Sequence, residues 1–253
     1  MATGCRIVSA MDKDTRQSGA LVLLPNGLDS SVSSDTFLTP EVARLVPGLS
    51  GLIAESTRGA YAFLKRFVYG ESRTFRDVPL SLLNEHSSPD QTDALASAIR
   101  QKGGRWGLIA DTGLPVLADP GARLVATVRR FGIPVEAHPG PSAIILALML
   151  SGFHGQRFTF HGYFPRSLSD LKKISVLIRR EVGYVHLFIE TPYKTEKTLR
   201  TLLKTLPPDR TLCVAADLTL KSRSIIVKPV SRWREAECHG FGKRPAVFIM
   251  GKP

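Results

Sequence analysis

Residues 110–121 read ADTGLPVLADPG, a stretch that follows an apolar segment and precedes a segment of helical period. Two prolines, two glycines and two aspartates in twelve positions predict a stiff, sharply turning loop. Asp119 and Pro120 favour the start of a helix, because an aspartate can cap the first amides and proline fits the first turn. The first half of the loop begins no helix, and Gly113 leaves its backbone open to the close approach of a ligand.

On both sides of this loop, apolar runs that predict strands alternate with segments of helical period. The predicted strands are residues 20–24, 51–54, 78–83, 105–110, 133–137, 157–162, 186–190, 212–216, 224–227 and 246–250. The predicted helices are residues 40–46, 57–67, 91–102, 122–131, 142–150, 168–180 and 195–206. This alternation favours an α/β fold with a largely parallel sheet. We expect a loose tail over 1–18, an N-terminal α/β domain over 19–139 and a C-terminal α/β domain over 140–253.

Positive charge is the main peculiarity of the composition. The chain has 253 residues, with 34 Lys and Arg against 22 Asp and Glu, and a formal net charge of +12. Residues 156–234 hold 16 Lys and Arg against 6 Asp and Glu, so most of the excess lies in the C-terminal third. Such a surface suits a polyanionic partner such as RNA, because phosphate contacts supply affinity. A basic surface that only keeps the protein in solution is the alternative.

The cysteines and the apolar runs indicate the cellular setting. Cys5, Cys213 and Cys238 form no CxxC pair and no disulfide framework, which is typical of a reducing compartment. The longest apolar run, residues 143–150, falls short of the roughly 20 residues that a membrane helix needs. Residues 1–18 lack the apolar core of a secretory signal. We therefore expect a cytoplasmic protein without a membrane segment.

The sequence lacks the motifs of several common enzyme and metal sites. The sequence contains no GxGxxG, GxxxxGK[ST], GxSxG or HExxH, and its six histidines show no ligand spacing. Metal and nucleophilic-serine sites are therefore disfavoured. In open α/β sheets, ligands bind at the carboxyl ends of the strands. Four loops placed there combine glycine, proline and small hydroxyl residues, which suits a polar small molecule held by backbone groups: residues 25–27, 111–115, 138–142 and 190–194.

A series of seven short blocks resembles one known family. The blocks read GLIAESTR (51–58), NEH (84–86), LIADTGLP (108–115), ADPG (118–121), HPGPSA (138–143), FIETP (188–192) and ADLT (216–219). Their order is similar to that of the tetrapyrrole methylase superfamily, the class III S-adenosylmethionine-dependent methyltransferases. Within it, the chain most resembles the ribosomal RNA small-subunit methyltransferase I branch, which methylates a cytidine ribose 2′-hydroxyl. The resemblance runs from about Leu21 over nearly the whole chain.

The resemblance implies two α/β domains with S-adenosylmethionine in the cleft between them, RNA as the partner, and a homodimer. Carried over position by position, it assigns cofactor contacts to Asp111, Thr112, Gly113, Leu114 and Pro115, to Pro139, Gly140, Ser142 and Ala143, and to Glu190, Thr191, Ala215 and Ala216. On this interpretation Gly113 bares backbone groups for the adenosyl moiety, while the prolines lower the ordering cost of binding.

The acceptor requires chemistry of its own. Methyl transfer is an in-line displacement, so catalysis is mainly the alignment of donor and acceptor. A ribose hydroxyl must also lose its proton, which makes Glu55 and His86 candidate bases, with Arg58 and Asn84 as orienting or phosphate-binding residues. In the alternative interpretation, Glu55 caps a helix and forms a solvated ion pair with Arg58, and His86 carries no chemistry.

RNA binding is predicted for six cations. Four of them fall on one predicted helix, at spacings that bring them together across about two turns; the full set is Lys172, Lys173, Arg179, Arg180, Lys221 and Arg223.

The first loop departs from the family pattern. It usually reads PTPIGN, whereas residues 24–29 read LPNGLD and a serine-rich segment follows over 30–34. This difference suggests a divergent paralogue. Two other functions therefore stay open. One is a small-molecule tetrapyrrole methylase, which the basic C-terminal third argues against. The other is a non-catalytic RNA-binding protein on a methylase fold, which a blocked first loop would favour.

Overall fold

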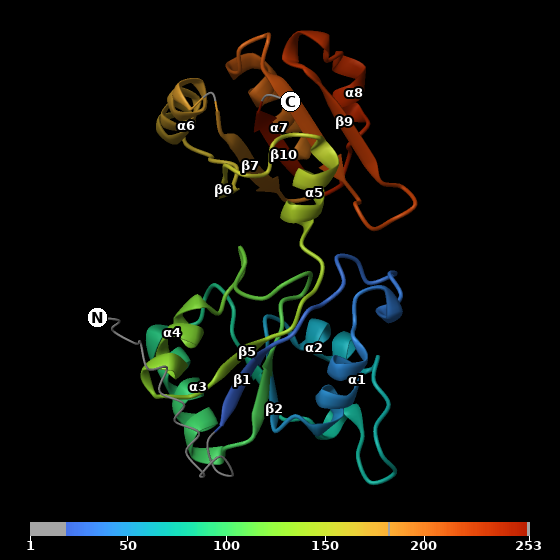
Figure 1. Cartoon of the computed structure of the whole chain (residues 1–253), viewed down its shortest axis with the longest axis vertical. Coiled ribbons are helices and arrows are strands. Elements are labelled where there is room, and N and C mark those ends of the chain that lie inside the picture. The colour runs from blue at the N-terminus through green and yellow to red at the C-terminus, as the bar shows by residue number, and fades with distance from the viewer. Residues whose placement is uncertain (1–18, 182, 252–253) are drawn as a thin grey trace, which may run out of the picture. The chain divides into compact units, whose positions relative to one another are not determined.

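Two sheets organise the chain (Figure 1). The computed structural model describes residues 19–181 and 183–251, so the predicted tail over 1–18, with Cys5, lies outside the described residues. Residues 19–26 and 38–139 form a first unit, and residues 27–37 group with the segment that begins at Gly140 in a second unit. The predicted first domain had included residues 27–37, whose regular structure is limited to the 3-10 helix Ser34–Thr36.

The first unit is built on a fully parallel sheet. Its strand order is β3-β2-β4-β1-β5, with bounds β1 Ala20–Leu23, β2 Gly51–Ala54, β3 Leu80–Leu82, β4 Arg105–Leu108 and β5 Val135–Ala137. Because all five strands run in the same direction, the loops that follow them leave from one edge. The predicted ligand loops over 25–27 and 111–115 begin at this edge, where α/β sheets bind their ligands.

Helices cover both faces of this sheet, as Figure 1 shows. One face carries α1 (Pro40–Leu45) and α2 (Thr57–Leu64), and the other carries α3 (Pro89–Lys102) and α4 (Ala122–Arg130). Leu21 packs in the cluster under α3 and α4, and Val22 packs in the cluster under α1 and α2. This is the alternation that a strand buried on both faces requires.

The helix predicted over 122–131 is present, but the predicted cap at Asp119, with Pro120 in the first turn, is wrong. Helix α4 begins at Ala122, its N-cap position is Gly121 with φ 129°, and no side chain caps it. Ala118 also has a positive φ, of 72°, so the chain turns sharply on both sides of Asp119. The carboxylate of Asp119 therefore does not bind the first amides of the helix.

The second unit is built on a mixed sheet. Its order is β6-β7-β10-β8-β9, with bounds β6 Phe158–Tyr163, β7 Val185–Glu190, β8 Thr211–Ala216, β9 Ser224–Pro229 and β10 Ala246–Gly251. Only β6 and β7 are parallel, while β10 is antiparallel to β7 and β8, and β8 is antiparallel to β9. The largely parallel sheet that we expected is therefore confined to the first unit, because the short connection over 217–223 returns the chain directly as a hairpin.

Unequal layers cover this second sheet. Helix α5 (Ala143–Ser151) packs on one face, and the other carries α6 (Leu168–Arg180), α7 (Thr195–Thr205) and α8 (Glu235–His239). Helix α8 was not predicted, because five residues are too few for a helical period to register. Cys213 and Cys238 are buried free thiols. Within the described residues, no helix combines the length and apolarity needed to cross a membrane.

The packing of the first sheet makes Gly51 irreplaceable. A Cβ at Gly51 would lie 2.4 Å from the ring of Trp106, whose Nε1 is held by a hydrogen bond to the carbonyl of Gly103. We expect Gly51→Ala to lower the free energy of unfolding by about 2 kcal/mol, as other overpacked cores do. Urea denaturation measures this loss. The matched control is Gly48→Ala, since a Cβ there meets nothing within 4 Å; equal stability of the two variants would contradict the prediction.

Candidate functional site

Asn26 fixes the turn that follows β4. This side chain is 5% exposed, and its Nδ2 donates hydrogen bonds to the carbonyls of Ala110 (3.1 Å) and Asp111 (2.9 Å). Its backbone N–H donates to the carbonyl of Gly113 at 2.8 Å. Asn26, in the loop that follows β1, thus fixes the path of residues 110–113, in the loop that follows β4.

The carboxylate of Asp111 is held from the neighbouring strand. The hydroxyl of Ser56, at the N-cap of α2, donates to both oxygens of Asp111 at 3.0 Å and accepts the N–H of Gly59 at 2.9 Å. The N–H of Asp111 donates to Oε1 of Glu55 at 3.1 Å. A Cβ on Gly59 would lie only 2.0 Å from Oδ1 of Asp111, so the arrangement requires glycine at that position.

Three carboxyl groups share this edge of the sheet. Burial, followed by the charges of Glu55 and Asp111, raises the pKa of Asp119 to about 7. Burial also raises the pKa of Glu55, against the opposing hydrogen bond from the N–H of Asp111. Asp119 can therefore exchange a proton near neutral pH. The negative field of the ionised carboxylates at this edge favours a bound cation.

The turn also contains unpaired backbone donors. Within the described residues, the amides of Thr112, Gly113 and Leu114 donate no hydrogen bond. Gly113 has φ 72°, and Val116 follows with the strained value of 75°. Left-handed non-glycine residues concentrate at binding sites, where the surrounding structure holds them in place. The turn therefore fits a polar ligand that is recognised by backbone groups.

The predicted catalytic residues lie in the loops after β2 and β3. Glu55 is half-buried and bonded to Asp111, whereas Arg58 is exposed on the first turn of α2. The side chain of His86 is 85% exposed, with Nε2 3.7 Å from Oε1 of Glu85. The alternative role of Glu55 as a helix cap is wrong, because Ser56 caps α2. No ion pair joins Glu55 to Arg58 within the described residues.

The predicted cofactor segment over 138–143 belongs to both units. Pro139 ends the first unit and Gly140 begins the last segment of the second. In the first unit, Nε2 of His138 is buried and has no hydrogen-bond partner among the described residues. In the second, the hydroxyl of Ser142 accepts the N–H of Ile145 at 3.5 Å and caps α5, which begins at Ala143.

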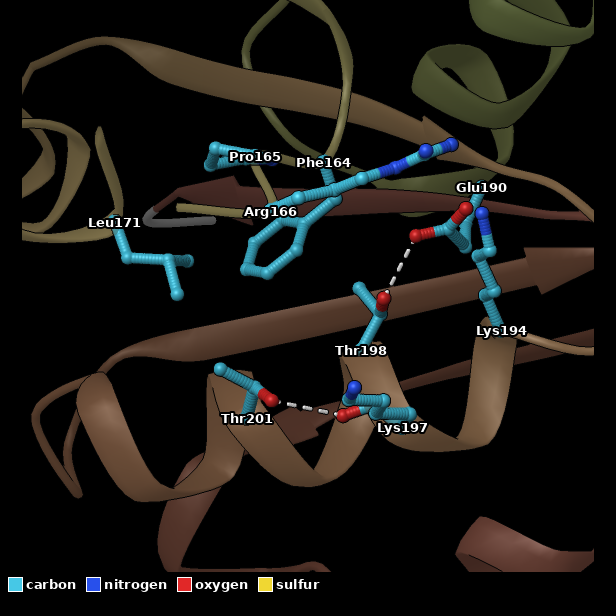
Figure 2. Close-up of a pocket in the computed structure, with 9 residues that line it drawn as sticks. All are labelled: Phe164, Pro165, Arg166, Leu171, Glu190, Lys194, Lys197, Thr198 and Thr201. Atoms are coloured by element: carbon cyan, nitrogen blue, oxygen red, sulfur yellow. Dashed lines mark hydrogen bonds between the residues drawn. The ribbon is translucent and has the colours of Figure 1, made fainter. Parts of the chain in front are cut away.

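In the second unit, the predicted cofactor residues also serve the fold. The carboxylate of Glu190 accepts hydrogen bonds from the N–H (2.8 Å) and hydroxyl (3.2 Å) of Thr191 and from the hydroxyl of Thr198 (2.8 Å; Figure 2). Ala215 and Ala216 are buried on opposite faces of the sheet, and β8 is paired along both sides. Their part in cofactor binding stays a prediction.

The predicted RNA-binding cations are exposed. On α6, Lys172 lies two turns from Arg179, as Lys173 does from Arg180. Nζ of Lys173 lies 3.1 Å from a carboxylate oxygen of Asp170.

The loop that carries Lys221 and Arg223 is held in place by Arg244, which lies just before β10. Nε of Arg244 donates to Asp217 at 2.7 Å, and the hydroxyl of Ser222 donates to the same carboxylate at 2.8 Å. This bracing holds the two exposed cations on an ordered loop.

Sequence reasoning missed three residues of the first-unit edge: Asn26, Ser56 and Asp119. Asn26 was visible only as part of a Pro-Asn-Gly loop, and Asp119 was mistaken for a helix cap.

Within the described residues, no three His, Cys, Asp or Glu side chains are grouped to hold a metal ion.

Comparisons with known sequences agree on one family. The profile of the tetrapyrrole (corrin/porphyrin) methylases matches residues 40–232. The chain is 30% identical over 205 residues to the ribosomal RNA small subunit methyltransferase I of Thermotoga maritima, a match that covers 79% of this chain and 86% of the relative. It is 34% identical over 209 residues to the protein of the same name from Leptospira borgpetersenii, covering 81% of this chain and 77% of the relative.

Solved structures show the same fold. The methyltransferase CobJ matches with a TM-score of 0.61 and 16% identity, over 93% of this chain and 100% of that chain. A uroporphyrin-III C-methyltransferase from Thermus thermophilus, complexed with S-adenyl homocysteine, matches with a TM-score of 0.52 and 14% identity, over 92% and 98% of the two chains. The expected α/β fold class of this family is therefore confirmed.

The carboxyl cluster predicts a pH-dependent stability. Asp119 titrates near 3.8 in the unfolded chain and at about 7 in the folded one. Between these values the folded state binds a proton that the unfolded state has lost, so the free energy of unfolding falls as pH rises. We expect Asp119→Asn to gain stability over the wild type progressively between about pH 4 and about pH 7. Urea denaturation across this window measures the difference.

The control for this prediction is Asp209→Asn. It removes one aspartate from an exposed turn of the second unit without touching the cluster. A stability difference between wild type and Asp119→Asn that does not vary with pH would contradict the raised pKa of Asp119.

Proposed function

Because this chain belongs to the tetrapyrrole (corrin/porphyrin) methylase family, we propose that it transfers the methyl group of S-adenosylmethionine to RNA of the small ribosomal subunit. The donor follows from family membership. The RNA acceptor is supported by the names of the relatives from Thermotoga maritima and Leptospira borgpetersenii, and by the basic surface of the second unit. The observation that carries the proposal is the turn over 110–113, fixed by Asn26 at the ligand-binding edge of a parallel sheet.

The turn supplies the recognition of the donor. In this proposal the open amides of Thr112, Gly113 and Leu114 bind the polar atoms of the adenosyl moiety. When bound, S-adenosylmethionine supplies an electrophilic methyl group on a positively charged sulfonium. The carboxyl groups of Glu55 and Asp111 favour that charge through their field. The other predicted cofactor residues, from Pro139 to Ala143 and on the second unit, remain predictions.

The acceptor step needs a base and a means of orientation. Glu55 is the side chain we propose to take the proton from the ribose hydroxyl, because it lies beside the turn and burial raises its pKa. Arg58 is exposed on the next helical turn and is proposed to hold a neighbouring phosphate. His86 lies on the adjoining loop and is the second candidate base. The cations of α6 and the loop over 217–223 are proposed to contact the RNA backbone.

Two coarser features complete the proposal. We propose a homodimer, which the family resemblance implies. We also propose that the protein acts in the cytoplasm, since its acceptor belongs to the ribosome.

Donor binding depends on Gly113. We expect Gly113→Val to abolish binding of S-adenosylmethionine and of its demethylated product, since a branched side chain would fill the space beside the open amides and strain the turn. Isothermal titration calorimetry measures both affinities. The matched control is Gly132→Val, because Gly132 has nearly the same φ of 73° and a Cβ there meets nothing within 4 Å. Normal donor binding by Gly113→Val would mean that the turn is only structural.

The acceptor can be found by comparing RNA from living cells. We expect ribosomal RNA from a deletion strain to lack one 2′-O-methylated nucleoside that mass spectrometry detects in the parent. Complementation with wild type should restore it, and complementation with Glu55→Gln should not, since the amide cannot take a proton. An unchanged set of nucleosides in the deletion strain would contradict an RNA acceptor. Methylation of a tetrapyrrole by the purified enzyme would then identify a tetrapyrrole as the acceptor.

A further inference from the structure

A pocket of about 210 Å³ lies in the second unit (Figure 2). Phe164, at the end of β6, and Leu171, on α6, form an apolar wall. Opposite them lie Glu190, at the end of β7, and Thr198, on α7, joined by their hydrogen bond. The pocket is smaller than the roughly 300–1,000 Å³ of sites that enclose a whole small molecule, so it suits one part of a larger ligand.

Three cations line this pocket: Arg166, Lys194 and Lys197. Figure 2 shows the Arg166 side chain extending toward the side of the pocket where Glu190 and Lys194 lie. None of the three cations forms an ion pair within the described residues. Among the described lining residues, Glu190 is the only carboxylate, and it accepts hydrogen bonds from Thr191 and Thr198 instead. The pocket therefore carries an excess of positive charge, which suits an anion.

A strained aromatic residue adjoins the pocket. Tyr193 directly precedes Lys194, is 75% exposed, and has φ 73°. Nζ of Lys243 lies 5.3 Å from the centre of its ring. A left-handed backbone is unfavourable for any residue with a Cβ, and this one presents an aromatic face to solvent beside a cationic pocket. Exposed aromatic rings beside cations are the means by which proteins bind the bases and phosphates of single-stranded nucleic acids.

We propose that this pocket binds one backbone phosphate of a single-stranded RNA segment, and that Tyr193 stacks on a neighbouring base. The inference rests on the proposed function and names a substrate contact for it. Arg166 and Lys197 would contact the phosphate oxygens, while Lys194 neutralises the remaining charge. The apolar wall is suited to the adjoining sugar. Single-stranded RNA is favoured over a duplex, because the bases of a duplex are stacked on one another and cannot stack on the ring of Tyr193.

The test measures binding of a labelled single-stranded RNA oligonucleotide against salt. We expect Arg166→Ala/Lys197→Ala to bind about tenfold more weakly for each cation removed. The slope of log affinity against log salt should shrink by about 0.7 for each contact. Arg44→Ala/Arg129→Ala is the matched control, since it removes two exposed cations from the first unit. Unchanged affinity and slope in the pocket variant would overturn the proposal.

Tyr193 provides an independent test. We expect Tyr193→Gly to weaken RNA binding about tenfold through the loss of stacking, while its melting temperature stays equal or rises because glycine accepts the left-handed backbone. Tyr193→Phe should retain RNA affinity. Retained affinity in Tyr193→Gly would overturn the stacking role.

Two further measurements separate this inference from the proposed function. Calorimetry should show that the pocket variants bind S-adenosylmethionine as the wild type does, and loss of donor binding would reassign the pocket to the donor. If the wild type methylates ribosomal RNA but the pocket variants bind RNA normally, the pocket inference alone fails. If the wild type neither binds nor methylates RNA, the proposed function itself fails.

Discussion

The hydrogen bonds of Asn26 are the constraint on which the first-unit site depends. Its amide binds the carbonyls of Ala110 and Asp111, and its backbone binds Gly113. Each bond contributes about 0.5–1.5 kcal/mol, but their geometric effect is larger. Asn26 engages carbonyls of the turn, while the amides of Thr112, Gly113 and Leu114 donate no hydrogen bond within the described residues. A site that reads a ligand through its backbone needs this division, because a mobile turn would lose affinity to ordering.

Charge is distributed unequally between the two units. The half-buried carboxyl groups of Glu55 and Asp119 follow strands of the first sheet, where burial and then neighbouring carboxylates raise their pKa values. Cations without ion pairs line the pocket of the second unit, and further cations cover α6. A sulfonium donor and a polyanionic acceptor have opposite electrostatic needs. One chain can satisfy both only by placing the two kinds of surface on different elements.

Backbone strain follows the same distribution. Within the described residues, the non-glycine positions with positive φ are Val116, Ala118, Tyr193 and Asp217. All four lie in loops that follow strands: β4 for the first two, β7 for Tyr193 and β8 for Asp217. Such conformations cost about 1–3 kcal/mol each, and the sheets supply the rigidity that maintains them. The strain is therefore found in or next to the segments that we assign to ligand contact.

The sequence by itself determined the two α/β units, the positions of nearly all helices and strands, and the family, because periodicity and the ADTGLPVLADPG and HPGPSA blocks are local features. It could not show that Asn26 binds a turn more than eighty residues away, or that Asp119 is half-buried near the charge of Glu55 instead of capping α4. Nor could it predict the mixed second sheet or the meeting of Arg166 with Lys194 and Lys197 in one pocket. These features depend on which strands become neighbours, and strand order is decided by tertiary packing.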